Sequence, residues 1–398
     1  MKRKLLFVIE SLGAAGAERS LVSLLAALDY SRFDVDLQLF RYGGDLERYL
    51  PERVHLLPPF DYTQFTEKPL WKQLISGDIK KIARRLGYSF LIRMGNSTHA
   101  DKARFYWKTV GGCLPEKKES YDIAIAYSQG IPTFYVAEKI HAHRKISWVN
   151  VSYKLSVKNR YFQSAFYNEI QHIVCVSETA KAIFDEEFLG YRNKTLVIRD
   201  RIDPTLIRRL ANEYPANLEK DIPIILTVAR FAPQKGYDVS LETCGILRDR
   251  GISFKWYAIG KGPLRGEMER VVQEKQLLDR FIFLGTFANP YPYFKAATLY
   301  VQTSRHEGFG LSIAEARVLG IPVVTTEFDA VWQQMAQGKN GLVVPQDPVA
   351  IADAIERMLT EKDLYDSIVS YLAQESFESD ETLLRFYGLL ENVKSPTQ

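Results

Sequence analysis

The sequence predicts an α/β fold made of two doubly wound, Rossmann-like domains in series. The chain has 398 residues, and at roughly 100–200 residues per domain this length favours two domains. Short apolar runs alternate with amphipathic helical patterns almost throughout, which is typical of a parallel sheet covered by helices on both faces. The alternation breaks near residue 200 and restarts at Ile222, so each half has its own series.

The first series covers residues 1–205. Residues 59–120 interrupt it, and their Lys, Arg and aromatic content predicts helices and loops inserted into this domain. The first apolar run is too short for a secretory signal and is followed at once by Glu10, so it is interpreted as a buried strand. The expected elements are a helix at Glu18–Leu28 and strands at Lys4–Ile9, Val35–Phe40, Tyr121–Ala126, Lys145–Val149, Ile173–Val176 and Leu196–Ile198.

The second series covers residues 206–379, and a final amphipathic helix is expected at Asp380–Val393 within residues 380–398. Two such domains would bring the carboxyl ends of their sheets together around a central cleft, where ligands of these folds bind. Strands are expected at Ile222–Val228, Ser253–Ile259, Phe281–Leu284, Thr298–Thr303 and Pro322–Thr325, and helices at Tyr237–Arg248, Leu264–Lys275, Leu311–Leu319 and Pro348–Leu359.

Composition indicates a soluble globular protein, since 46% of residues are hydrophobic and 25% are charged. No apolar stretch approaches the ~20 residues that span a bilayer. The three cysteines lie far apart without metal-ligand spacing, which argues against a disulfide framework and predicts a reducing, cytoplasmic location. The net charge is +8 over residues 1–200 and −4 over residues 201–398. A basic first half suits an anionic membrane surface or an acidic acceptor, although unevenly spread solvated charge is an equal alternative.

The most informative stretch is TSRHEGFGLSIAEARVLGI at residues 303–321. An expected strand ends at Thr303, a loop with two glycines follows, and a helix begins near Leu311. Free amide groups at the start of that helix favour an anion. Glu307 and Glu315 could accept hydrogen bonds from sugar hydroxyls beside a bound phosphate. Taken singly, each is more simply a turn residue or a solvated helix residue, but the EGFG loop between them favours the site.

The stretch VARFAPQKG at residues 228–236 places Arg230 and Lys235 after another expected strand. Two cations there suit a diphosphate and would offset charge on a departing nucleoside diphosphate. Two exposed loop cations are the alternative. IGKGPLRG at residues 259–266 is close to a dinucleotide fingerprint, but its glycine spacing departs from that pattern, so a tight strand-to-helix turn is favoured. In LGAAGAERS at residues 12–20, Gly16 permits a close approach to ligand, and Glu18 could serve either a ligand or the helix dipole.

No carboxylate or histidine cluster predicts a metal site. Asp34 and Asp36 form a DxD pair, but they enter a strand at the end of the sheet away from the expected cleft, and we interpret them as surface residues. His306 is more simply structural than a substrate contact.

Together these motifs resemble the retaining glycosyltransferases of family 4, which have the GT-B fold. The likeness runs through nearly all of the second domain and the first ~30 residues. It rests on Arg230 followed by Lys235-Gly236, on Gly260-x-Gly262-Pro-Leu, on the block Glu307–Ala316, on Gly320–Val324 and Gly341–Pro345, and on Val176–Glu178 with Ile202-Asp203.

The resemblance implies a role for each matched position. Arg230 and Lys235 would contact the donor diphosphate, Glu315 would bind the ribose, and the backbone near Gly16 would close on the phosphates. Gly260 belongs to the same donor site, and the last helix would cross back to the first domain. The donor sugar would be held by Glu307 and the backbone of Gly308, Phe309, Gly310 and Leu311. Transfer would retain the anomeric configuration, and such families usually need no metal.

Some positions depart from the family. Ala15-Gly16 stands where Gly-Gly is common, Asn150 stands near a common histidine, and Asp329–Gln333 replaces a Gly-x-x-Glu. Residues 40–120 match nothing in the pattern, so they leave the acceptor open.

The predicted function is transfer of a sugar from a nucleotide-sugar to a glycan or lipid-linked acceptor in surface polysaccharide or glycoconjugate synthesis. A UDP-sugar is the favoured donor. No cofactor and no nucleic-acid partner are expected. Peripheral contact with the anionic inner face of a membrane is expected from the basic first half. The alternatives are a nucleotide-sugar 2-epimerase of the same fold, a non-catalytic sugar-nucleotide-binding subunit, and an NAD(P) oxidoreductase built on IGKGPLRG.

Overall fold

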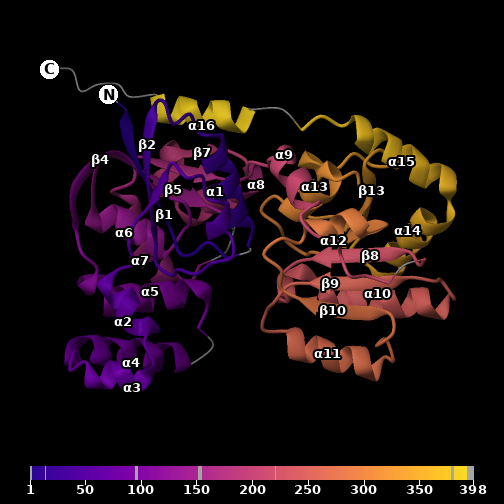
Figure 1. Ribbon diagram of the computed structural model, residues 1–398, viewed down its shortest axis with the longest axis horizontal. Coiled ribbons are helices and arrows are strands. Elements are labelled where there is room, and N and C mark those ends of the chain that lie inside the picture. The colour runs from indigo at the N-terminus through magenta and orange to yellow at the C-terminus, as the bar shows by residue number, and fades with distance from the viewer. Residues whose placement is uncertain are drawn as a thin grey trace. The chain divides into compact units, whose positions relative to one another are not determined.

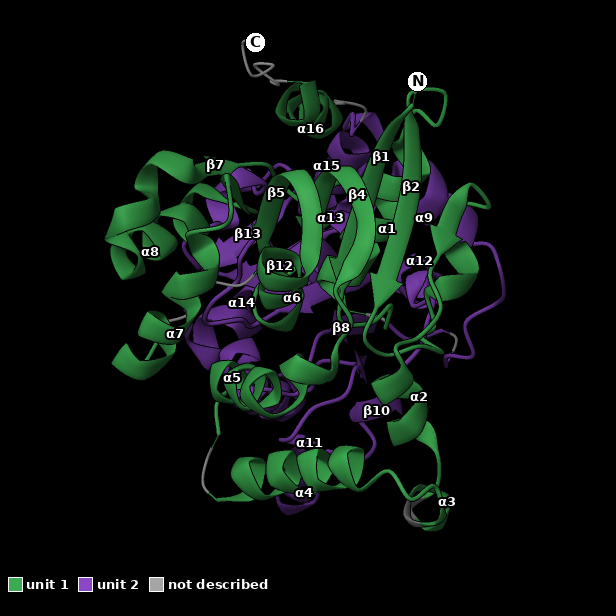
Figure 2. Cartoon of the chain, turned by 90° about the vertical axis from the view of Figure 1, so that its left-hand side faces the viewer, with its two compact units in different colours: residues 1–201, 381–398 green, residues 202–380 purple. Residues whose placement is uncertain are grey.

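The chain forms two compact units, coloured separately in Figure 2. Unit 1 comprises Met1–Arg201 and Glu381–Gln398, and unit 2 comprises Ile202–Asp380. The computed structural model describes residues 2–13, 15–94, 97–150, 155–219, 221–377 and 381–391. Asp380 and Val393, the two ends of the expected last helix, therefore lie outside the described residues. No helix of the described chain combines the length and hydropathy needed to cross a bilayer.

The centre of unit 1 is a seven-stranded parallel sheet in the order β3-β2-β1-β4-β5-β6-β7. The first strand pairs with β2 along one edge and with β4 along the other, and Leu5–Val8, whose side chains alternate between the two faces of the sheet, have no exposed surface. This explains the unbroken apolar run, because strands covered on both faces do not alternate. The strands are β1 (Arg3–Ile9), β2 (Phe33–Leu39), β3 (Val54–Leu56), β4 (Lys117–Ala126), β5 (Ile140–Val149), β6 (His172–Cys175) and β7 (Thr195–Val197).

Helices cover both faces of this sheet (Figure 1). On one side Trp107 of α5 packs against Phe134 of α6, with ring centroids 5.8 Å apart. On the other side Phe386 of α16 packs against Phe7 and Trp148 of the sheet. The helices are α1 (Gly16–Ala27), α2 (Asp61–Glu67), α3 (Leu70–Ile75), α4 (Ile79–Arg93), α5 (His99–Val110), α6 (Ile131–Lys139), α7 (Val157–Tyr167), α8 (Glu178–Glu187) and α16 (Glu381–Glu391).

Unit 2 is a six-stranded parallel sheet in the order β10-β9-β8-β11-β12-β13. The strands are β8 (Ile224–Val228), β9 (Lys255–Ile259), β10 (Phe281–Gly285), β11 (Leu299–Gln302), β12 (Val323–Thr326) and β13 (Gly341–Val344). The helices are α9 (Pro204–Leu210), α10 (Tyr237–Asp249), α11 (Arg265–Glu274), α12 (Tyr291–Ala296), α13 (Leu311–Val318), α14 (Pro348–Thr360) and α15 (Lys362–Gln374). The predicted pair of doubly wound α/β domains is confirmed.

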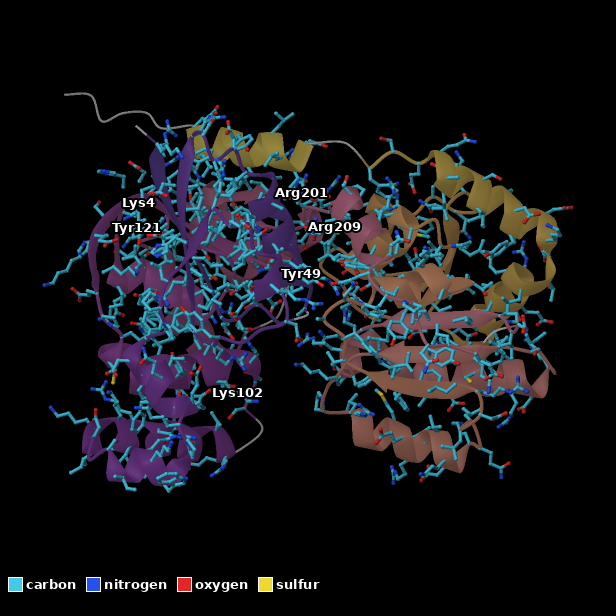
Figure 3. All side chains as sticks on the ribbon, in the orientation of Figure 1. Lys4, Tyr49, Lys102, Tyr121, Arg201 and Arg209 are labelled. Carbon is cyan, nitrogen blue, oxygen red and sulfur yellow. The ribbon has the colours of Figure 1, made fainter. Side chains whose placement is uncertain are left out.

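The structure corrects the interpretation of Asp36, which is only 5% exposed and is not a surface residue. Its carboxylate accepts a hydrogen bond from the Tyr121 hydroxyl at 2.7 Å and lies 2.9 Å from Nδ1 of His55. The ammonium of Lys4 lies 5.0 Å from the centre of the Tyr121 ring (Figure 3). Polar partners from β3 and β4 thus satisfy a carboxylate that was expected in solvent. Asp34 is exposed, as expected.

Candidate functional site

The candidate residues of unit 2 surround the point where its strand order reverses. β8 and β11 are neighbours in the sheet, and the chain leaves β8 toward β9 and leaves β11 toward β12. Connections that depart in opposite directions open a crevice at the carboxyl ends of the two strands, where ligands of this architecture bind. The loop after β8 carries Arg230 and Lys235, and the loop after β11 carries Glu307–Gly310.

An ion pair joins the two loops directly. Nζ of Lys235 lies 2.5 Å from Oε1 of Glu307, and the two side chains are only 15% and 11% exposed. The same carboxylate oxygen accepts hydrogen bonds from Nε2 of Gln302 at 3.0 Å and from the hydroxyl of Ser304 at 2.7 Å. A carboxylate with several donors has a fixed position, so Glu307 is preorganised before any ligand arrives.

A chain of hydrogen bonds extends this arrangement into the core. The hydroxyl of Tyr300 donates to Oε1 of Gln302 at 2.8 Å, which turns the amide nitrogen of Gln302 toward Glu307. Burial raises the pKa of Tyr300, so its hydroxyl remains a donor at neutral pH. Gln302 and Ser304 were not among the predicted site residues. The available signal was polar side chains at the carboxyl end of a buried strand, in YVQTS.

The loops after β8 and β11 also contact each other through their backbones. Gly236 has a φ of +64°, and a Cβ there would lie 2.0 Å from the carbonyl oxygen of Thr303. The hydroxyl of Thr303 donates to the carbonyl of Gly236 at 2.9 Å. Arg305 forms a bidentate pair with Asp238 at 2.9 and 2.6 Å. Gly236 is therefore required for close packing of the loops, and this packing positions Lys235 opposite Glu307.

The EGFG loop ends at Gly310, whose φ of +85° favours glycine and turns the chain into α13. Gln334 donates to the carbonyl oxygens of Phe309 and Gly310, and Thr326 donates to the carbonyl of Ser304 at 2.6 Å. Leu311 is the first residue of α13, so the amides of the preceding turn lie at the positive end of the helix. Hydrogen bonds to its carbonyl oxygens hold the loop in place. Its N–H groups, near the start of α13, can bind an anion.

Arg230 is exposed in the loop after β8. Gly260 follows β9, and its place in the donor site stays a prediction. A Cβ at Gly260 would lie 2.0 Å from the carbonyl oxygen of Ala229, and one at Gly262 would lie 2.2 Å from that of Phe231. The IGKGPLRG glycines thus let this loop pack on the backbone of the Arg230 loop, which is the tight turn favoured from the sequence.

Glu315 lies on α13 and is 3% exposed. The hydroxyl of Tyr291, on α12, donates to its Oε1 at 3.0 Å. Tyr291 was not predicted, and its distance in sequence from Glu315 gave no signal. The predicted contact of Glu315 with a ribose stays a prediction. His306 is exposed.

In unit 1 the strand order reverses between β1 and β4, and the matching loops carry Gly16 and Tyr127. Gly16 is the first residue of α1, and Glu18 lies in its first turn. Burial raises the pKa of the Glu18 carboxyl. The hydroxyls of Ser20 and Tyr127 lie 3.0 Å apart, and the amide nitrogen of Asn150 donates to the carbonyl of Tyr127 at 2.7 Å.

Residues 2–13, 15–94, 97–150, 155–219, 221–377 and 381–391 contain no group of three or more His, Cys, Asp or Glu side chains that could hold a metal ion. Cys113 is half-buried, whereas Cys175 and Cys244 are buried, and burial raises the pKa of both thiols to about 12. These two thiols therefore stay protonated at neutral pH and are not nucleophiles.

Comparison with known proteins finds a family that matches most of unit 2. Residues 211–375 match the family model "Glycosyl transferases group 1". The chain is 30% identical over 156 residues to alpha-D-kanosaminyltransferase from Streptomyces kanamyceticus, covering 38% of this chain and 40% of that protein. It is 29% identical over 145 residues to the lipopolysaccharide core biosynthesis glycosyltransferase LpsE from Rhizobium meliloti, covering 36% and 42%. The matching segments thus span less than half the length of these two relatives.

Among solved structures, Anabaena HepE in complex with UDP-glucose superposes with a TM-score of 0.72 at 18% identity, covering 98% of this chain and 100% of that one. At this identity the similarity concerns the fold. The predicted GT-B fold of two Rossmann-like domains is confirmed, while the expected cleft stays a prediction.

Proposed function

We propose that this chain, whose residues 211–375 are a glycosyl transferases group 1 domain, is a glycosyltransferase that moves a sugar from a UDP-sugar to a glycan or lipid-linked acceptor. The observation that carries the proposal is the contact between Lys235 and Glu307 at the strand-order reversal of unit 2. In this proposal Lys235 is the cation for phosphate and Glu307 the carboxylate for sugar hydroxyls, near the N-terminal end of α13. The UDP-glucose complex of a protein with the same fold supports UDP as the nucleotide.

In the proposed donor site, Lys235 and the exposed Arg230 contact the diphosphate. An ammonium group has three N–H donors, so Lys235 can keep its bond to Glu307 while it donates to a phosphate oxygen. Both cations would stabilise the charge that develops as UDP leaves. Glu307, with the backbone amides of Gly308–Leu311, would hold the sugar. Glu315 would bind the ribose, and Gly16 of unit 1 would allow its loop to approach the phosphates.

We propose that transfer retains the anomeric configuration and needs no metal. The bond from the anomeric carbon to the diphosphate oxygen breaks, and the acceptor oxygen bonds to that carbon on the same face. The acceptor proton passes to the leaving phosphate oxygen, so UDP and the glycoside are the products. This scheme assigns proton transfer to the substrate itself, and the cationic side chains act on the leaving group. The acceptor would be bound by unit 1 at the inner membrane face.

A thermal-shift panel with UDP, GDP, ADP, NAD and NADP tests the donor assignment. A ligand that binds only the folded state raises the midpoint by mass action. We expect UDP to raise the midpoint of the wild type and to lose this effect in Lys235→Ala. Lys275→Ala is the matched control, because Lys275 follows α11 at the other end of the strands and pairs with Glu242 instead. It should respond as the wild type does.

The other outcomes identify the alternatives. A response to NAD or NADP alone would contradict the transferase proposal and favour the oxidoreductase. If UDP binds, turnover of a UDP-sugar without an acceptor into its C2 epimer would identify an epimerase. Binding of UDP-sugar with no turnover on any acceptor would favour a non-catalytic subunit. The anomeric configuration of the product, read by nuclear magnetic resonance, tests retention.

A further inference from the structure

The helix α4 carries a continuous apolar stripe on its exposed side. Ile79, Leu86 and Phe90, with Met94 just beyond its end, are 64–77% exposed, and the structure shows no buried residue in α4. With Ala83, also exposed, these positions are spaced by three or four residues and form one continuous outward stripe. A surface helix normally turns such a stripe toward the core.

Cationic side chains fix α4 in this orientation. Lys81 contacts the carboxylates of Asp61 at 2.5 Å and Asp78 at 3.0 Å. Arg85 donates to the carbonyl oxygen of Thr66 at 3.2 Å, and Arg84 donates to the sulfur of Cys113. The ring of Tyr88 also packs against that of Tyr106 on α5, with centroids 5.6 Å apart. These contacts tie the inner face of α4 to unit 1, so the tertiary structure holds the apolar stripe outward.

The preceding helix α3 extends the exposed apolar surface. Trp71 and Ile75 are 58% and 76% exposed, and Nζ of Lys72 lies 5.2 Å from the centre of the Trp71 ring. In both views α3 and α4 lie at the end of unit 1, with α2 and α5 between them and the sheet (Figures 1 and 2). We name the exposed side chains of Trp71, Ile75, Ile79, Ala83, Leu86, Phe90 and Met94 the outer stripe.

The net positive charge around the outer stripe indicates which kind of partner the stripe can bind. Residues 68–110 contain ten Lys and Arg against two Asp, a net charge of +8, whereas the rest of residues 1–200 contains twenty of each sign. The whole basic excess of the first half therefore lies in residues 68–110, within the inserted segment. Lys68, Lys72, Lys80, Arg93, Lys102 and Lys108 are exposed, with Lys102 on α5 (Figure 3). A second copy of this chain would oppose two such segments of like charge, which is unfavourable.

We propose that the outer stripe and its exposed lysines are a docking surface for an anionic lipid bilayer. An interfacial helix buries an apolar face with aromatic residues at the boundary of the headgroups and acyl chains, while nearby cations attract anionic headgroups. Solvated charge would by itself explain the basic first half equally well, and the outward apolar stripe favours the membrane. The docking surface itself does not depend on the proposed function. Its purpose does rest on that function, because membrane binding would bring unit 1 to a lipid-linked acceptor.

Co-sedimentation of the full chain with vesicles tests the proposal. We expect the wild type to bind phosphatidylcholine vesicles that contain phosphatidylglycerol, to bind pure phosphatidylcholine at least tenfold more weakly, and to lose affinity at high salt. L86S/F90S should reduce binding to the anionic vesicles on the order of tenfold through loss of buried apolar area. K72E/K80E should reduce it at least as much. L278S in unit 2, where Leu278 is 66% exposed, is the apolar control and should bind as the wild type does.

Three results would overturn the proposal: no binding of the wild type to anionic vesicles at low salt, unchanged binding by L86S/F90S, or loss of a concentration-dependent dimer in that variant. The second would indicate a general polyanion site and the third a contact between copies. The substituted side chains are exposed, so all variants should keep the wild-type thermal midpoint and its rise with UDP. Vesicle binding without a UDP response would contradict the proposed function and leave the docking surface intact.

Discussion

Lys235 and Glu307 are 72 positions apart in the chain, and their charged groups are in contact in the folded protein. The contact depends on β8 and β11 being neighbours, because each residue lies in the loop that follows one of these strands. Opposite charges at a nearly buried position stabilise each other, and removal of one partner leaves the other poorly solvated. The pair therefore links the stability of unit 2 to its proposed donor site.

Breaking this pair should destabilise the protein. In Lys235→Met, Glu307 keeps only the neutral donors Gln302 and Ser304, and we expect a loss of about 1–3 kcal/mol in the free energy of unfolding. Glu307→Gln should cost a similar amount, and the double variant should cost about 1–2 kcal/mol less than the sum, because the two side chains interact. Urea unfolding followed by circular dichroism measures these values.

The control for the ion pair is Lys275→Met, which breaks a pair with Glu242 whose side chains are 35% and 54% exposed. Exposed pairs contribute about 0–1 kcal/mol, so this variant should unfold close to the wild type. If the losses in unfolding free energy of Lys235→Met and Glu307→Gln simply added in the double variant, the ion pair would not contribute to stability in solution.

Gly260→Ala should destabilise unit 2 by about 2–4 kcal/mol, because its Cβ would lie 2.0 Å from the carbonyl oxygen of Ala229 and the backbone φ is +155°. The clash would also displace the loop that carries Arg230, so the midpoint shift with UDP should shrink. Gly245→Ala, within α10, is the matched control.

At Gly245 an added Cβ meets no atom within 4 Å. Alanine there should stabilise the helix by about 0.5–1 kcal/mol. Thermal and urea unfolding of both variants measure these opposite changes in stability, a loss in Gly260→Ala and a gain in Gly245→Ala. Equal stability of Gly260→Ala and the wild type would show that the two loops can separate at no cost.

Asp101 should make the stability of unit 1 depend on pH in the acid range. Hydrogen bonds from Thr98, Arg104 and Asn159 lower the pKa of its carboxyl, with the Thr98 hydroxyl as the largest cause. The stabilisation is present above the unfolded pKa of about 3.9 and is lost as pH falls through the lower folded pKa. Asp101→Asn should therefore lower the thermal midpoint at pH 7.

The difference between Asp101→Asn and the wild type should narrow as pH falls from 5 to 2, measured by circular dichroism melts in low-salt buffer. Thr98→Val removes the main hydrogen-bond donor to Asp101. The thermal midpoint of this variant should therefore depend less on pH between 5 and 2 than that of the wild type. A constant difference at all these pH values would mean that Asp101 contributes only as a neutral cap of α5.

The sequence determined much of the fold because strands and helices encode their own periodicity. The apolar runs at Lys4–Ile9 and Ile222–Val228 lie close to the observed β1 and β8, and the pattern near Leu311 gave the start of α13. β3, β13 and α15 were not predicted, since a three-residue strand and an edge strand carry weak patterns of their own. Motif order also gave the loops that carry Arg230, Lys235 and Glu307.

Tertiary structure decided the contacts between those loops. Strand order, which no local pattern encodes, brings Lys235 to Glu307, and the packing of α12 near α13 supplies Tyr291 as the partner of Glu315. It also decides that Gly260 serves packing against Ala229. For residues 59–120 the sequence predicted helices and loops rich in Lys, Arg and aromatic residues. The contacts of Lys81, Arg85 and Tyr88 with unit 1 decide which side of α4 faces outward. Periodicity is a local property of the chain, whereas the direction in which a face points depends on partners that are distant in sequence.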